Sequence, residues 1–235
     1  YQDSKAQAAR EARIVKEMAA KGIPPEGALA LLQAPKLFAQ HCSSCHTYDG
    51  ENGIGNKVED PSAPDLKDFA SREYLTELLH PKRFGSDKFF GKTAHAKKSK
   101  MQGFLEDEFD GIDDDQALRE AVDQLIKAIS AEAKLPRQAK ADVEDKADIE
   151  AGRKLFFEDG FSCVDCHALD DWNSDDYSAP DLTGYGSREW MIGILNDPSH
   201  ERFYGSKNDR MPAFGKDEKL TRRQMERIVD WLRGE

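Results

Sequence analysis

The strongest constraint on this chain is a five-residue motif that occurs twice. Two cysteines separated by two residues are followed at once by a histidine, at positions 42–46 (CSSCH) and again at positions 163–167 (CVDCH). The chain has 4 cysteines, and the two copies of the motif use all of them. Two thiols three positions apart lie on one side of a helical turn, and the histidine follows directly. Any fold of this chain therefore has to present two thiols and an imidazole together, at two places.

This spacing is typical of covalent haem attachment. The two thiols of a motif can add to the two vinyl groups along one edge of a haem, and the imidazole that follows can reach the iron. The predicted attachment residues are Cys42, Cys45, Cys163 and Cys166. The predicted proximal iron ligands are His46 and His167. The predicted cofactors are two covalently bound haem c groups.

Two other interpretations of the cysteines compete with haem. Four thiols can pool into one zinc site, but the two pairs lie 118 residues apart, and zinc leaves the histidine after each pair unexplained. A thioredoxin-like dithiol requires a βαβ pattern around it, and no such pattern is visible. The duplicated motif therefore favours haem.

The match between the two halves extends well beyond the cysteines, which indicates a tandem duplication. The matching segments keep the same order in both halves: KLF at 36–38 and 154–156, SAPDL at 62–66 and 178–182, SRE at 71–73 and 187–189, RFGS at 83–86 and RFYGS at 202–206, and MQGF at 101–104 and MPAF at 211–214. The predicted organisation is an N-terminal helix and tether over 1–32, a first domain over 33–132, a linker over 133–146 and a second domain over 147–235.

The predicted fold class is all-α with long loops, because apolar residues recur with helical spacing and no segment alternates as a strand does. Helices are expected over 3–21, 115–131 and 221–232, with short helices carrying each motif and others beginning near Ser71 and Ser187. Each repeat is expected to pack its first helix against its own last helix, through Phe38 in one repeat and Phe156 in the other. Gly152 is expected to allow a close approach in the second pair.

Charge and hydropathy exclude several functions. The net charge is −11 and no sustained basic stripe exists, which argues against nucleic-acid binding. No apolar run approaches the roughly 18 residues of a membrane span. No signal-peptide pattern is present, so we expect a mature chain, a fragment or a cytosolic protein. Residues 82–100 hold seven lysines and arginines against one acid, Asp87; they form either a solvated loop or a docking surface.

With these residues in place, the chain resembles tandem class I-type cytochromes c over roughly residues 33–235. The shared pattern is a helix, the CxxCH motif, a proline-containing loop, a methionine loop and a C-terminal helix. A narrower resemblance rests on the runs at 22–27, 37–42, 185–190 and 209–214. These look like the dihaem c-type portion attached to cytochrome b in some bacterial quinol:cytochrome c oxidoreductases.

The resemblance implies distal iron ligands. Met101 and Met211 would fill this role, each in a loop and each followed three positions later by a phenylalanine, Phe104 or Phe214. A thioether ligand raises the reduction potential relative to two histidines. His95, six residues before Met101, is an alternative ligand for the first haem. The remaining histidines are expected to be exposed or capping side chains.

The resemblance also implies residues around the ligands. Pro64 and Pro180 would each offer a carbonyl oxygen to the Nδ1–H of a ligand histidine, unless they are ordinary loop prolines. Arg72 and Arg188 would pair with haem propionates, or be surface arginines at helix termini. Trp190 is expected to line the second haem pocket together with Tyr185, and Tyr74 the first pocket; all three can equally be core residues.

Two six-coordinate haems suit one-electron transfer and leave no open site for substrate, so no catalytic residue is predicted. The expected partners are redox proteins, with an iron–sulfur protein or a cytochrome as donor and acceptor, and cytochrome b-type membrane subunits if the narrower resemblance holds. The expected location is extracytoplasmic, periplasmic or equivalent, because the resemblance implies haem attachment there. The alternative is a dihaem peroxidase in which one haem loses its distal ligand.

Overall fold

The computed structural model describes residues 8, 12–13, 15–16, 19–20, 25–96, 99–157, 160–170 and 178–235, with side chains in the first long helix described from residue 32. Within this part of the chain every regular element is a helix, and the only β-type pairings are isolated bridges of Glu51 with Tyr48 and with Lys57. The all-α prediction is confirmed. The predicted helix over 3–21 lies mostly outside the described residues.

The helices follow the repeat in the sequence. The first repeat contains α2 (Pro25–His41), α3 (Arg72–Leu78), α4 (Pro81–Phe84), α5 (Lys100–Glu108) and α6 (Gln116–Glu132). The second repeat contains α8 (Lys146–Phe157), the 3₁₀-helix η2 (Cys163–Asp165), α9 (Arg188–Asn196), the 3₁₀-helix η3 (Gly205–Lys207) and α10 (Arg222–Arg233). Between the repeats lie the 3₁₀-helix η1 (Pro136–Gln138) and α7 (Ala139–Glu144).

Side-chain caps fix where these helices begin. Ser71 and Ser187 cap α3 and α9, and each hydroxyl accepts a hydrogen bond from the backbone N–H three residues on. Asp115 caps α6 in the same way, and Thr221 caps α10 in a reciprocal capping box with Gln224. The predicted starts of these four helices are confirmed to within a residue.

The segment predicted as a polar linker, 133–146, is mostly helical and is attached to the first repeat. Leu135 is fully buried and Gln138 nearly so. The Gln138 side chain accepts a hydrogen bond from the backbone N–H of Arg72 and donates one to Ser130. The polar composition of this segment predicted a loose linker, but the segment packs on the first repeat. It does so through a few inward-facing residues, which composition alone does not reveal.

The prediction that each repeat packs its first helix on its own last helix is wrong. The helix α2 packs against α10 of the second repeat, with the rings of Phe38 and Trp231 5.4 Å apart. The helix α8 packs against α6 of the first repeat. Gly152 does allow a close approach, but to α6, since a Cβ there would lie 1.9 Å from the carbonyl oxygen of Gln124. Apolar spacing identifies the face that a helix buries and not the partner that covers it.

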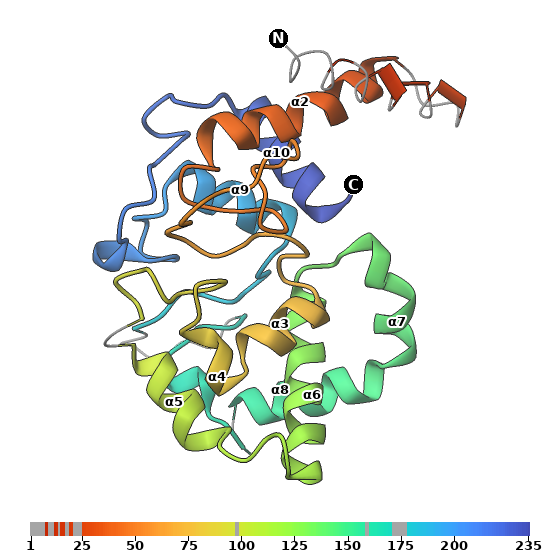
Figure 1. The fold of residues 1–235 in the computed structure, drawn as a ribbon. Coiled ribbons are helices and arrows are strands. Elements are labelled where there is room, and N and C mark those ends of the chain that lie inside the picture. Colours follow the sequence, from red (N-terminus) through yellow and green to blue (C-terminus); the bar gives the residue numbers. More distant parts are fainter. Residues whose placement is uncertain are drawn as a thin grey trace.

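Two lobes result, each built from both repeats, as Figure 1 shows. We call the first the α10 lobe; it contains α2, α9 and α10. We call the second the α6 lobe; it contains α3, α4, α5, α6 and α8. The buried apolar residues of both lobes form one continuous core.

The chain passes between the lobes at two equivalent positions that touch each other. Ala70 and Gly186 occupy the same place in the repeat, one residue before the capping serine, and both have a left-handed backbone with φ of 62° and 72°. A Cβ on Gly186 would lie 2.2 Å from the Cβ of Ala70. Only glycine fits at position 186. A side chain there would collide with Ala70, and the left-handed backbone is unfavourable for other residues.

No helix in the described part of the chain is long and apolar enough to cross a membrane.

Candidate haem-binding sites

The backbone of each CxxCH motif forms one tight turn. In the first copy the N–H groups of Cys45 and His46 both donate to the carbonyl oxygen of Cys42, at 3.0 and 2.8 Å. In the second copy the N–H groups of Cys166 and His167 donate to that of Cys163, at 3.1 and 2.9 Å. This turn puts both thiols and the imidazole of a motif close together. The first turn continues directly from α2, whereas the second lies in η2, which a loop separates from α8.

Each motif histidine is held by a carbonyl oxygen of a proline. The distance from His46 Nδ1 to the oxygen of Pro64 is 2.7 Å, and that from His167 Nδ1 to the oxygen of Pro180 is 2.8 Å. These are the contacts that the resemblance implies. A protonated Nδ1 that donates to a carbonyl leaves Nε2 with its lone pair, which is the arrangement that a metal ligand requires.

Burial keeps the site groups uncharged. It lowers the pKa of His46 and of His167 against the opposing effect of the proline carbonyl bonds, so both imidazoles are neutral at pH 7. It also raises the pKa of the Cys42 and Cys163 thiols to about 12. A neutral imidazole can donate its lone pair to iron, and neutral thiols in the two motifs are consistent with attachment residues.

The loop that presents Pro64 is fixed by Asp65, a residue that the sequence analysis did not single out. This carboxylate is 7 % exposed. It accepts hydrogen bonds from the Thr47 hydroxyl at 2.5 Å and from the backbone N–H groups of Asp49, Gly50 and Lys67. Desolvation opposes its charge, but these donors together lower the pKa of Asp65. The signal was present in the sequence, because this aspartate recurs within SAPDL in both repeats.

The second repeat has an equivalent backbone contact at its own aspartate, and this contact shows how the two repeats align. The N–H of Asp65 donates to the carbonyl oxygen of Lys88, and the N–H of Asp181 donates to that of Arg202, at 2.8 and 2.9 Å. Each of these basic side chains lies over the ring of the phenylalanine that follows it. Residues 202–205 are therefore the structural equivalents of 88–91, and the sequence match of 202–206 with 83–86 is wrong.

The two methionines differ in local structure. Met211 lies in a loop, as expected, and its carbonyl oxygen accepts a hydrogen bond of 2.9 Å from the Asn208 side chain. Met101 is not in a loop: it is the second residue of α5, whose first turn is capped by Ser99. Both methionines, and Phe104, are partly buried against the core, and Phe214 is buried. Their role as distal ligands stays a prediction.

The other histidines have structural surroundings. His80 caps α4 and accepts the backbone N–H of Lys82 through Nδ1, and His200 is exposed and accepts that of Arg202, so both agree with the expectation. The His95 ring stacks on Tyr204 at 5.3 Å and meets the edge of Phe90. His41 meets the ring of Phe214 edge-on at 6.4 Å. His95 as a ligand stays an open prediction, although its ring is held between the two repeats.

The two arginines predicted to meet haem propionates are paired with carboxylates of the chain. Arg72 binds Asp142 and Asp145 and so attaches α7 to the start of α3. Arg188 binds Asp230 at 2.7 Å and joins α9 to α10. Both arginines lie at the start of a helix, as the alternative to propionate binding expects. Their contact with haem propionates stays a prediction.

The aromatic residues predicted to line the haem pockets meet where the lobes join. Phe69 lies 5.3 Å from Tyr185 and 6.2 Å from Trp190, so it bridges the two repeats. The Trp190 indole N–H donates to the carbonyl oxygen of Asp181 at 3.0 Å and so supports the loop that presents Pro180. Tyr74 meets the edge of Phe89, as Trp190 meets that of Phe203. These residues belong to the core between the sites.

The donor set fits haem c better than zinc. The described residues contain no group of three or more His, Cys, Asp or Glu side chains placed to hold a metal ion, so the four thiols do not converge on one zinc. Each motif instead offers two thiols on one turn and one neutral imidazole whose Nδ1 is already bonded. Two thioether positions and one axial nitrogen are what haem c requires of a protein.

Comparison with known families agrees with this donor set. The family described as cytochrome c matches residues 33–121, and the family described as cytochrome c oxidase, cbb3-type, subunit III matches residues 147–232. No curated protein and no solved structure matches the chain. Each family match covers one repeat and contains its CxxCH motif. The chain therefore belongs to the c-type cytochromes, and it carries two cytochrome c domains in tandem.

Proposed function

We propose that this chain is a dihaem cytochrome c that relays single electrons between two redox proteins, with both haems bound covalently. The observation that carries the proposal is the duplicated contact of a motif histidine with a proline carbonyl oxygen, at 2.7 and 2.8 Å. Haem c supplies a one-electron couple at its iron. The chain supplies two thiols and a neutral imidazole at each site, and a methionine thioether would complete each ligand set.

The residues of the chain also shield and orient these ligands. The imidazoles of His46 and His167 are only partly exposed, and Cys42 is buried. The proline carbonyl oxygens fix the ring orientation of each histidine, which in turn sets the direction of the Nε2 lone pair. Rigid ligands suit electron transfer, because little has to move when the charge on the site changes.

The test is a redox titration of the purified holoprotein followed by optical absorption and EPR. We expect two haems per chain that remain attached after denaturation, two one-electron steps, and low-spin spectra with a methionine–iron charge-transfer band. One haem per chain, or haem that is extracted by acidic solvent, would overturn the proposal. The peroxidase alternative predicts a high-spin haem that binds cyanide or CO and turns over peroxide.

The proposal extends to a complex and a location. The chain would act as the cytochrome c1-like part of an extracytoplasmic quinol:cytochrome c oxidoreductase, accepting electrons from an iron–sulfur protein. The support is the resemblance of the runs at 22–27, 37–42, 185–190 and 209–214. Purification of the chain from native membranes should recover a cytochrome b subunit and quinol-dependent reduction of its haems. A chain that purifies alone from the periplasmic fraction would overturn this assignment.

Several basic residues of the cluster at 82–100 are paired with acidic residues in the structure, so only part of the cluster is available as a docking surface. Lys82, Lys88 and Lys92 each pair with acidic residues, mostly from outside the cluster. Lys97 and Lys98 lie outside the described residues. Lys100 is exposed at the start of α5, one residue before Met101.

We therefore predict that docking depends on the lysines that directly precede Met101 in the sequence. Reversal of Lys97, Lys98 and Lys100 to glutamate should slow electron transfer with the natural partner at low salt by about tenfold or more, because charge complementarity acts on the association rate. The control reverses Lys140 of α7 and Lys146 at the start of α8, both of which are exposed. Stopped-flow rates at two ionic strengths measure the effect, and equal rates for both variants would exclude the surface.

A further inference from the structure

The first CxxCH motif lies in the α10 lobe, together with helices of the other repeat. It follows directly from the end of α2, which packs against α10. The Arg227 side chain of α10 binds that of Gln33 on α2. Just beyond the motif, the ring of Tyr48 lies 4.4 Å from Trp231 on α10. Both flanks of the motif are thus fixed to the last helix of the second repeat.

The segment that follows Met211 is fixed in the same lobe, while Asp209 and Arg210, directly before it, bond the backbone of Ala94 and Lys92 in the first repeat. Two residues after Phe214, the N–H of Lys216 donates to the carbonyl oxygen of Asn196 at the end of α9, at 3.1 Å. The helix α9 itself packs on α10. The ring of Phe214 meets that of His41, the residue directly before Cys42, at 6.4 Å. Met211 and the first motif therefore belong to one lobe, although they come from different repeats.

The second motif and Met101 show the mirror arrangement in the α6 lobe. Phe161, two residues before Cys163, meets the edge of Phe109 at 4.8 Å. Phe109 caps the end of α5, the helix that begins beside Met101. After the motif, Asp170 is bound by Arg153 of α8, which also binds Glu132 of α6 at 2.8 Å. Both flanks of the second motif are thus fixed to the first repeat.

We propose that the repeats exchange their axial methionines: His46 and Met211 serve one haem, and His167 and Met101 serve the other. This inference rests on the proposed function for the presence of two haems with His and Met ligands, and it adds which ligands act together. Colinear pairing within a repeat would place His46 with Met101. The chain crosses from one lobe to the other at Ala70 and at Gly186. In each repeat the CxxCH motif lies before this crossing and the methionine after it, so the motif of one repeat shares a lobe with the methionine of the other.

The experiment marks one haem and then removes one methionine. Cys42→Ala leaves the first haem attached through Cys45 alone, and its unreacted vinyl group moves the absorption bands of that haem to longer wavelength. In this background we expect Met211→Ala to abolish the methionine–iron charge-transfer band of the marked haem and to lower its potential. Met101→Ala should leave the marked haem unchanged and alter the unmarked one.

The matched control carries the mark on the other motif, as Cys163→Ala, and should give the reverse assignment. If Met101→Ala alters the haem marked through Cys42→Ala, pairing is colinear and the inference is overturned, while two haems with His and Met ligands still stand. If the marked protein without a methionine substitution shows no charge-transfer band, the proposed His and Met ligation fails, and the exchange fails with it. Counting covalent haems in the same samples tests the proposed function separately.

A measurement on the unsubstituted holoprotein keeps the inference testable if the marked variants do not fold. Proton NMR of the reduced, diamagnetic protein should show ring contacts of Trp231 with Phe38 and Tyr48, and of Phe161 with Phe109. Contacts of the Phe38 ring with side chains of α6 in place of Trp231 would show that the lobes are colinear in the holoprotein and would overturn the exchange.

Discussion

At the scale of single residues, a buried aspartate beside Pro64 supports the first candidate site. Asp65 collects four hydrogen bonds and holds the chain that presents the Pro64 carbonyl oxygen to His46. Hydrogen bonds to a buried carboxylate stabilise more than those between neutral groups. The orientation of the His46 ring therefore depends on a charge two contacts away from it.

We predict that Asp65→Asn destabilises the protein by about 2 kcal/mol at pH 7, because the neutral amide accepts these hydrogen bonds poorly. The folded-state pKa of Asp65 lies below the unfolded value of 3.8. Its contribution is therefore complete above about pH 4, and it is lost as the pH falls through the lower folded-state value. Denaturant unfolding of both proteins between pH 2 and pH 7 should show curves that converge in acid.

The control for this prediction is Asp107→Asn, which changes an exposed carboxylate on α5. It should leave the free energy of unfolding nearly unchanged. A constant difference between wild type and Asp65→Asn over the whole pH range would contradict the role given to the Asp65 charge.

At the scale of helices, the contact of α8 with α6 is set by one glycine. A Cβ at Gly152 would lie within 1.9 Å of a backbone oxygen, and backbone in a helix cannot move aside as a flexible side chain can. Gly103, in α5, is also helical but has no atom within 4 Å of the position of a Cβ. These two helical glycines therefore differ in packing.

We predict opposite effects of alanine at these two glycines. Gly152→Ala should destabilise by about 2 kcal/mol, since overpacking costs more than the gain in helix propensity. Gly103→Ala should be neutral or stabilise by about 0.5–1 kcal/mol. Thermal and denaturant unfolding measure both changes. Equal changes in the two variants would mean that α8 does not approach α6 at residue 152.

The starts of four helices and the turn of each CxxCH motif could be predicted from the sequence because they depend on local signals. The capping residues Ser71, Ser187 and Thr221 act on their own helices, and the CxxCH spacing acts within one turn. The partners of the helices could not be predicted. Both repeats carry similar apolar faces, so α2 fits α6 or α10 by pattern alone. The sequence did not predict that Met101 lies in the first turn of a helix. The Ser99 cap of this helix follows a long insertion that has no helical periodicity.

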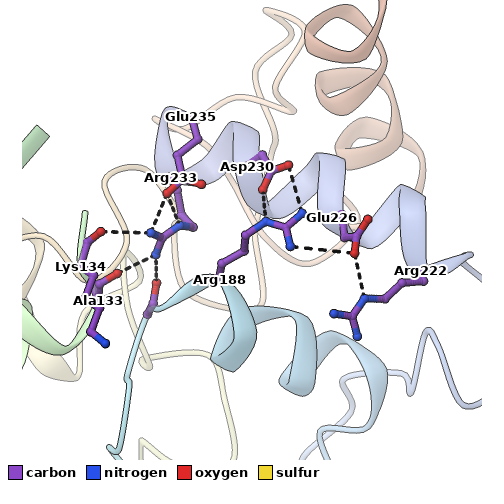
Figure 2. A network of polar contacts seen from close by, with 9 residues as sticks. Ala133, Lys134, Arg188, Arg222, Glu226, Asp230, Arg233 and Glu235 are labelled. Carbon is purple, nitrogen blue, oxygen red and sulfur yellow. Dashed lines mark hydrogen bonds and ion pairs between the residues drawn. The ribbon is translucent and has the colours of Figure 1, made fainter. Parts of the chain in front are cut away.

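At the scale of the whole molecule, Arg233 joins the two lobes. This side chain is 5 % exposed and donates to the carbonyl oxygens of Ala133, Lys134 and Gly186, as Figure 2 shows for the network around it. Its charge is balanced by Glu235 at 2.6 Å. One guanidinium thus connects the end of α10, the end of α6 and the crossing of the chain.

We predict that Arg233→Met destabilises the protein by about 3 kcal/mol, because the buried carbonyl oxygens of Ala133 and Gly186 and the part-buried one of Lys134 lose their donor. The absorption changes of both haems should follow one unfolding transition in wild type, since the lobes share a core. Arg222→Met, which removes an exposed arginine of the same helix, is the control and should change stability by less than about 0.5 kcal/mol. Two separate transitions in wild type would contradict a shared core.

The pairing of α2 with α10 also governs the order in which the chain can mature. Arg227 and Gln33 are 194 residues apart in the sequence, and α10 is the last helix of the described chain to be synthesised. The helix α2 therefore keeps the side that faces α10 uncovered until α10 has been synthesised. Contacts of such long range close slowly. We therefore expect the first CxxCH motif to stay accessible for the proposed haem attachment until α10 has formed, whereas α8 finds α6 already complete.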